Sequence, residues 1–195
     1  MNRKDAIAAI MSTTCGCEAV LSSLGLISRE IYDCYDAPNK FYVPGSMGLV
    51  SSIGIGLAVS RPQTTVIVID GDASLLMNLG TLVTAVQLSP ANFLHIVLDN
   101  GVYGSCSEER TMSAKANFEE IARITGFRHV YLVDAQEELK AAVKEAIGRG
   151  PAFVRARISL GGRRDFARPL ALEILRKRFM DFLVESDIVG RSKSQ

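Results

Sequence analysis

The stretch from 66 to 104 contains two apolar runs that flank a helical segment, and a polar turn follows each run. The first run, Val66–Ile69, is rich in β-branched residues and leads into the acidic turn Asp70–Ser74. The second run, Leu94–Leu98, ends in Asp99-Asn100-Gly101. Two strands joined by a helix predict a parallel βαβ unit. Because ligands bind beyond the carboxyl ends of such strands, we expect both polar turns to lie at a binding site.

Two side chains in these turns favour a metal. Asp72 supplies a carboxylate and Asn100 a side-chain amide, and oxygen ligands of this kind suit Mg²⁺ or Ca²⁺ rather than zinc. Gly71 lets the turn approach a ligand closely, and amides that enter the next helix can receive an anion. The residues indicate a metal–diphosphate site, although two ordinary turns with solvated polar side chains would give the same pattern.

Length and composition predict one globular domain. The chain has 195 residues, a hydrophobic content of 48% and a formal net charge of +1. We expect a single domain over residues 1–190 and a disordered tail at 191–195. The balanced charge does not favour nucleic acid or an acidic membrane surface as a partner. No apolar run reaches about 18 residues, and the first residues lack the apolar region of a secretory signal. The expected location is therefore the cytoplasm.

The rest of the pattern predicts an α/β fold with a mostly parallel six-stranded sheet and helices on both faces. Strands are expected near 18–21, 41–43, 66–69, 94–98, 128–133 and 151–158. Helices are expected near 3–11, 28–36, 48–60, 81–88, 117–125, 134–147 and 170–184. The helix at 117–125 opens on Asn117-Phe118-Glu119-Glu120, which resembles a capping box.

The cysteines and histidines are not expected to be catalytic. The chain has four cysteines, Cys15, Cys17, Cys34 and Cys106. Cys15-Gly16-Cys17 has neither zinc-knuckle nor thioredoxin-like spacing, so reduced thiols are the simplest interpretation. Cys106 is close to the expected site, but no histidine accompanies it in the sequence. His95 and His129 lie within or beside apolar strands and are predicted to be packed core residues.

A family resemblance rests on two spaced motifs. Gly71-Asp72-Ala73, followed after a gap of 25 residues (74–98) by Asp99-Asn100, resembles the thiamine diphosphate signature of GDG, a gap in the mid-twenties and NN. The sequence around these motifs is similar to thiamine diphosphate-dependent decarboxylases of sulfopyruvate (β subunit) and phosphonopyruvate. The same similarity holds for Phe41–Gly48, which contains Gly45-Ser46-Met47-Gly48. The resemblance extends from about Phe41 to Arg157 and implies the diphosphate-binding fold of that family.

The resemblance also implies a site. Asp72 and Asn100, with the Val102 carbonyl, would bind Mg²⁺ that bridges the cofactor phosphates. The Gly45 carbonyl would accept from the aminopyrimidine, and Met47 would support the folded cofactor. The implied cofactor-binding residues are Gly45, Ser46, Met47, Gly71, Asp72, Ala73, Ser74, Asn100, Val102 and Tyr103.

The implied function is that of the β subunit of a 2-oxo acid decarboxylase, a carboxy-lyase. It would convert sulfopyruvate to sulfoacetaldehyde and CO₂, a step toward coenzyme M; phosphonopyruvate is the alternative substrate. The family's activating glutamate lies in a pyrimidine-binding domain, for which these residues have no room. It is therefore expected on a separate α subunit, and no residue of this chain is assigned as catalytic. Arg110, Lys115 or the partner would hold the second anionic group of the substrate.

Three departures from the family pattern leave alternatives open. Ala73 replaces a glycine, Asp99 replaces an asparagine, and the loop 106–110 is more acidic than expected. A non-catalytic cofactor-binding or assembly subunit would fit decayed motifs. The thiamine subunit of a 2-oxoacid oxidoreductase is another rival, although the cysteines form no iron–sulfur motif. An isolated chain would expose the apolar surface meant for its partner and would tend to self-associate.

Overall fold

The computed structural model describes the backbone of residues 1–192 and the side chains of residues 1–186. Six strands form one sheet in the order β2-β1-β3-β4-β6-β5, and every neighbouring pair is parallel. The strands are β1 (Ala19–Ser22), β2 (Lys40–Tyr42), β3 (Val66–Gly71), β4 (Phe93–Asp99), β5 (His129–Val133) and β6 (Ala152–Arg157). This confirms the predicted α/β fold with a six-stranded sheet.

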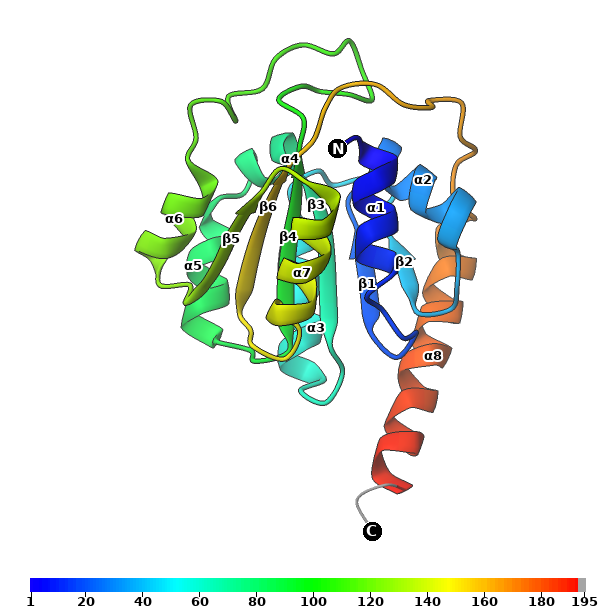
Figure 1. Ribbon diagram of the computed structural model, residues 1–195. Coiled ribbons are helices and arrows are strands. Elements are labelled where there is room, and N and C mark those ends of the chain that lie inside the picture. Colours follow the sequence, from blue (N-terminus) through cyan, green and yellow to red (C-terminus); the bar gives the residue numbers. More distant parts are fainter. Residues whose placement is uncertain (193–195) are drawn as a thin grey trace.

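Helices cover both faces of the sheet (Figure 1). One face carries α1 (Arg3–Met11), α2 (Leu26–Tyr35) and α7 (Gln136–Ala146), and the other carries α3 (Val50–Ser60), α4 (Asp72–Leu76), α5 (Gly80–Leu88) and α6 (Phe118–Thr125). The long α8 (Leu172–Ser192) lies beside the edge strand β2, where Phe179 packs on Phe41 with ring centroids 5.5 Å apart. Over the described residues, no helix is long and apolar enough to span a bilayer.

The sheet is buried on both sides because its central strands are mostly apolar: β3 is apolar from Val66 to Ile69, and β4 is apolar except at His95 and Asp99. In β3, Ile67 and Ile69 pack into the core under α1, α2 and α7, whereas Val66 and Val68 pack into the core under α3 and α5. Successive side chains of a strand point to opposite faces, so a continuous apolar run is needed to fill two cores. That continuous pattern explains why the strands β3 and β4 are the clearest elements in the sequence.

The connections create a crevice between β1 and β3. The helix that follows β1 lies on one face of the sheet, and the helices that follow β3 lie on the other. Adjacent strands whose connections leave in opposite directions mark a topological switch point, where ligands of open α/β sheets bind. Two loops, 101–116 and 159–171, also pass over this end of the sheet (Figure 1).

Several local predictions differ from the structure. Asp70 and Gly71 belong to β3 rather than to the turn after it, and both pair with β4. The prediction of a capping box at the start of α6 was wrong, because the Asn117 side chain makes no cap hydrogen bond. The tail expected from 191 is described only as far as Ser192, which still belongs to α8; residues 193–195 lie outside the described residues.

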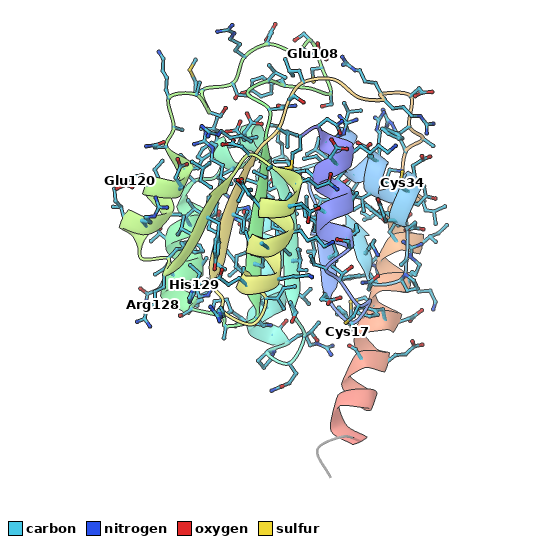
Figure 2. The ribbon with its side chains drawn as sticks, in the orientation of Figure 1. Cys17, Cys34, Glu108, Glu120, Arg128 and His129 are labelled. Atoms are coloured by element: carbon cyan, nitrogen blue, oxygen red, sulfur yellow. The ribbon has the colours of Figure 1, made fainter. Side chains whose placement is uncertain are left out.

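The histidines divide between core and rim. His95 is buried, as predicted, but its Nε2 lies 3.3 Å from a carboxylate oxygen of Asp70, which is also fully buried. His129 is only half-buried at the start of β5, at the outer rim of the sheet in Figure 2, so the prediction of a core residue was wrong. The cause is that β5 is an edge strand, and edge strands bury less than central ones. The four cysteines are free and exposed.

Candidate functional site

A cavity of about 150 Å³ lies at the carboxyl ends of β1, β3 and β4. Most of the residues predicted for cofactor binding line it, although they come from positions up to 56 residues apart in the sequence (47 to 103). The predicted residues that line it are Met47, Gly71, Asp72, Ala73, Ser74, Asn100, Val102 and Tyr103. Gly45 and Ser46 are not among the lining residues, so their contacts with a cofactor stay predictions.

Asp72 lines the cavity, and a hydrogen bond from Thr111 fixes its side chain. It opens α4, its side chain is buried, and its Oδ2 accepts a hydrogen bond of 2.5 Å from the Thr111 hydroxyl. Burial, aided by the negative charge of Asp99, raises the pKa of Asp72, while hydrogen bonds from Thr111 and Ser113 act in the opposite direction. No positive charge of the described residues is among the influences on this buried carboxylate, and a bound divalent cation would supply one.

Asn100 lies at the corresponding end of β4. Its Oδ1 accepts a hydrogen bond from the Val102 amide at 3.1 Å, and the left-handed Gly101, at φ +72°, turns the chain back over the cavity. The Val102 carbonyl accepts from the Gly104 amide at 2.9 Å and keeps a second lone pair for a cation. The carboxylate, amide and carbonyl oxygens form the hard donor set that Mg²⁺ prefers, and they therefore fit a Mg²⁺–diphosphate.

The turn before α3 is fastened to the Asp72 turn. The Gly48 amide donates to the Ser74 hydroxyl at 3.1 Å, and the Asn78 side chain donates to the Gly48 carbonyl at 3.0 Å. Gly48 has φ +93°, and a Cβ there would lie 3.1 Å from the Met77 Cβ. Glycine is therefore required at this position by both conformation and space. These contacts of Gly48 keep the preceding residue, Met47, at the cavity wall.

Ala73 causes no strain. It lies within α4 and is absent from the described non-glycine residues with positive φ, which are Ser46, Ser89 and Glu108. The glycine of the family signature is therefore not needed here for backbone conformation.

The sequence interpretation missed the loop between β1 and α2. Ser23 and Leu24 line the cavity, and Gly25, at φ +88°, precedes the first turn of α2 without any side-chain cap. The first amides of a helix lack intrahelical acceptors and favour anions, so this helix start can receive a phosphate. A signal existed in the small polar turn Ser22-Ser23-Leu24-Gly25 between an apolar strand and a helix.

Arg3 is the only basic side chain that lines the cavity within the described part of the chain. It is buried, forms an ion pair with Glu30 and donates to the carbonyl of Arg163 at 2.6 Å. Its position at the start of α1, far from the other motifs in sequence, explains why the spacing of those motifs could not indicate it.

Asp99 has a charge partner that explains why it can replace an asparagine. Arg155 on β6 hydrogen-bonds the Asp99 carboxylate and also donates to Glu119 at 2.7 Å and to the Ser113 carbonyl at 3.2 Å. Arg155 therefore neutralises the carboxylate of Asp99. This buried network also fixes the loop that carries Thr111, the partner of Asp72.

The acidic loop after β4 is partly neutralised. Glu108 pairs with Arg164 of the second overlying loop at 2.5 Å, and Arg164 also donates to the Cys106 carbonyl at 3.2 Å. Figure 2 shows Glu108 in the loop above the sheet. Arg110 and Lys115, two of the groups predicted to hold the substrate's second anionic group, are exposed and do not line the cavity. No glutamate lines it either among the described residues.

Comparisons with known proteins identify the family of this domain. The profile of the family described as "Thiamine pyrophosphate enzyme, C-terminal TPP binding domain" matches residues 23–156. Sulfopyruvate decarboxylase subunit beta of Methanocaldococcus jannaschii is 40% identical over 146 residues, which cover 74% of this chain and 77% of that protein. The matched region contains all the motifs that line the cavity from Ser23 to Cys106.

Longer relatives also match. Phosphonopyruvate decarboxylase of Streptomyces hygroscopicus is 35% identical over 169 residues, which cover 86% of this chain but only 42% of that protein. The chain thus spans about two fifths of the length of this curated relative. A solved 2-oxoglutarate:ferredoxin oxidoreductase from Magnetococcus marinus has a TM-score of 0.67 and 18% identity, covering 90% of this chain and 65% of the other. That likeness shows the shared fold.

Proposed function

This chain belongs to the thiamine pyrophosphate enzymes through their C-terminal TPP-binding domain, and we propose that it is the β subunit of a decarboxylase of sulfopyruvate. The reaction would yield sulfoacetaldehyde and CO₂. The observation that carries the proposal is the cavity in which Asp72 and Asn100 meet. Support for the substrate comes from sulfopyruvate decarboxylase β subunits, which this chain matches over about three quarters of both lengths.

The residues of the cavity would bind the cofactor by its diphosphate end. Asp72, Asn100 and the Val102 carbonyl would hold Mg²⁺, and the uncapped amides at the start of α2 would receive a phosphate. The bound cofactor would supply a thiazolium ring that accepts the electron pair left when CO₂ departs. The chain's own contribution is to bind and orient this group, and Met47 would press against its folded form.

The acid–base half of the chemistry would come from another polypeptide. Because no glutamate lines the cavity within the described residues, the group that activates the pyrimidine would be contributed from outside them. We propose a separate α subunit that carries the pyrimidine-binding domain. The exposed apolar side chains of α3 and the loop before it, such as Leu49 and Ile53, would border that subunit.

Phosphonopyruvate is the second candidate substrate. The Streptomyces phosphonopyruvate decarboxylase matches 86% of this chain, which supports phosphonopyruvate as a candidate. Both substrates carry a 2-oxo acid and a second anionic group, and Arg3 is the described basic residue at the cavity wall. A role in the route to coenzyme M and a cytoplasmic location stay predictions that go with the sulfopyruvate activity.

The test is turnover of the reconstituted pair. The chain would be co-expressed with the α subunit from its own source and assayed for CO₂ and aldehyde release from both substrates, with thiamine diphosphate and Mg²⁺ but without an electron acceptor. We expect activity from the pair and none from either chain alone. Asp72→Ala should abolish cofactor binding by calorimetry, whereas Asp181→Asn, at an exposed position on α8, should leave it unchanged.

Each failure would have a distinct meaning. Activity on phosphonopyruvate alone would overturn only the substrate. Full turnover by the isolated chain would overturn the two-subunit assignment. Cofactor binding without turnover on either substrate would favour a non-catalytic assembly subunit, and turnover that requires an electron acceptor would favour an oxidoreductase.

A further inference from the structure

A second cluster of reactive side chains lies at the opposite end of the sheet from the cofactor cavity. The loop between α1 and β1 contains Cys15, Cys17 and Glu18, next to the amino end of β1. Figure 2 shows Cys17 at the far end of the molecule from Glu108. The chemistry of the cavity therefore makes no use of these three residues.

The three side chains converge on one point. The Sγ atoms of Cys15 and Cys17 lie 2.6 Å apart, and the Cys15 Sγ lies 3.3 Å from Oε1 of Glu18. One ligand atom from each residue falls within 4.8 Å of the others. Two thiols and one carboxylate gathered in this way can become ligands of a single ion once the two sulfurs move apart.

The loop backbone holds the carboxylate in place. Glu18 is a buried residue. Its carboxylate accepts hydrogen bonds from the Cys15 amide at 3.1 Å and from the Gly16 amide at 3.0 Å. Gly16 adopts φ +91°, a conformation that glycine takes without strain and that brings the flanking cysteines to the same side. The Asn39 side chain anchors the Glu18 carbonyl at 2.8 Å. The carboxylate is therefore preorganised, while the two thiols are exposed and can adjust.

We propose that Cys15, Cys17 and Glu18 bind one thiophilic divalent cation of the zinc class. In this proposal Zn²⁺ binds as the two thiols become thiolates and their two protons leave to solvent. Thiolate ligands select zinc over magnesium, which distinguishes this site from the oxygen donors of the cofactor cavity.

The geometry needs one local change. Zinc–sulfur bonds of about 2.3 Å in a tetrahedral site place two sulfurs about 3.8 Å apart, so the thiols must separate from their present positions. Both cysteines are exposed and can do this by rotating about χ1. The fourth coordination position faces solvent and takes a water molecule.

The experiment titrates Zn²⁺ into the reduced chain in excess Mg²⁺, with calorimetry for stoichiometry and a pH indicator for proton release. We expect one Zn²⁺ bound and about two protons released. Cys15→Ser and Cys17→Ser should each weaken binding at least a hundredfold, and Glu18→Gln at least tenfold. The matched control is the double variant Cys34→Ser/Cys106→Ser, which removes the two cysteines outside the cluster and should keep full affinity.

Cd²⁺ provides an independent readout, because cadmium–thiolate bonds absorb in the ultraviolet. The absorption should appear in the wild-type chain and in the Cys34→Ser/Cys106→Ser control, and it should be lost in Cys15→Ser. The proposal would be overturned if Zn²⁺ bound equally well to Cys15→Ser and Cys17→Ser. It would also be overturned if the reduced chain bound no Zn²⁺ and the two thiols only formed a disulfide on air oxidation, seen as a loss of two mass units.

Discussion

Arg155 donates two hydrogen bonds to a single carboxylate oxygen of Asp99, from Nε at 2.9 Å and from Nη2 at 2.7 Å. Both side chains are less than a tenth exposed, and they join the neighbouring strands β4 and β6. Asp99 directly precedes Asn100, and its other oxygen accepts from the Gly101 amide at 3.1 Å. The ion pair therefore supports the turn that carries Asn100 into the cavity.

Removing Arg155 should be strongly destabilising because it leaves the Asp99 carboxylate buried without its partner. Arg155→Met is expected to lower the free energy of unfolding by about 3 kcal/mol or more. Glu119 also loses Arg155 as its partner, so the double variant Asp99→Asn/Arg155→Met removes one of two uncompensated charges and should recover part of that loss. Urea unfolding of the three chains measures both effects.

The control lies two residues away on the same strand. Arg157 pairs with Asp134, but both side chains are more than half exposed. Arg157→Met should change stability by only about 0–1 kcal/mol because surface ion pairs contribute little. Equal losses for Arg155→Met and Arg157→Met would contradict the importance assigned to burial.

Gly48 is expected to be intolerant of a side chain. Gly48→Ala forces a residue with a Cβ into φ +93°, against Met77 at 3.1 Å, and should cost about 1–2 kcal/mol as well as displace Met47 from the cavity wall. Gly56 is the matched control, because it lies on the exposed side of α3 with no atom near a new Cβ. Gly56→Ala should stabilise the chain by about 0.5–1 kcal/mol. Thermal unfolding distinguishes the two, and a stabilised Gly48→Ala would contradict this account.

Replacing Ala73 with the glycine of the family signature should be tolerated but should not improve cofactor binding. Since Ala73 is helical in α4, Ala73→Gly relieves no strain and should lower stability by up to about 1 kcal/mol. Affinity for thiamine diphosphate, measured with the partner subunit, should stay within a few-fold of the wild type. A large gain in affinity would show that alanine distorts the turn after all.

The sequence could indicate the central part of the fold because local pattern and tertiary environment agree there. Ile67 and Ile69 belong to an apolar run that only a doubly covered strand can bury, and the turns after β3 and β4 then meet at the cavity by topology. The site residues from Gly71 to Tyr103 followed from that relation together with the family resemblance.

Long-range partnerships could not be predicted in the same way. No pattern near Asp99 in the sequence indicates that Arg155 is its partner. Arg164 pairs with Glu108 only because two separate loops pass over the same end of the sheet. Arg3 likewise reaches the cavity through the packing of α1 rather than through a motif. Such contacts depend on where loops and helices pack, which a single sequence does not encode as a local pattern.

The anchor of α8 should weaken in acid. Arg178 donates from both terminal nitrogens to Asp36 at 2.7 Å, and the Tyr42 hydroxyl donates to the same carboxylate at 2.9 Å. Burial alone would raise the pKa of Asp36, but the hydrogen bonds from Arg178 and Tyr42 outweigh it and leave the pKa below its ordinary value. A carboxyl whose folded-state pKa is depressed stabilises the fold above its unfolded pKa and loses that contribution as pH falls through the folded value.

The pH window follows from this direction. At pH 7, Asp36→Asn should be less stable than the wild type by about 1–2 kcal/mol, since hydrogen bonds to a charged group are replaced by weaker ones. Below about pH 4, where an unfolded aspartate becomes protonated, the difference should shrink steadily. Urea unfolding of both chains between pH 7 and pH 3 measures it, with Asp181→Asn, in the exposed pair with Lys177, as the control that should show almost no difference at any pH. A gap between wild type and Asp36→Asn that persisted unchanged at pH 3 would show that the carboxylate's charge is not what holds α8 to the sheet edge.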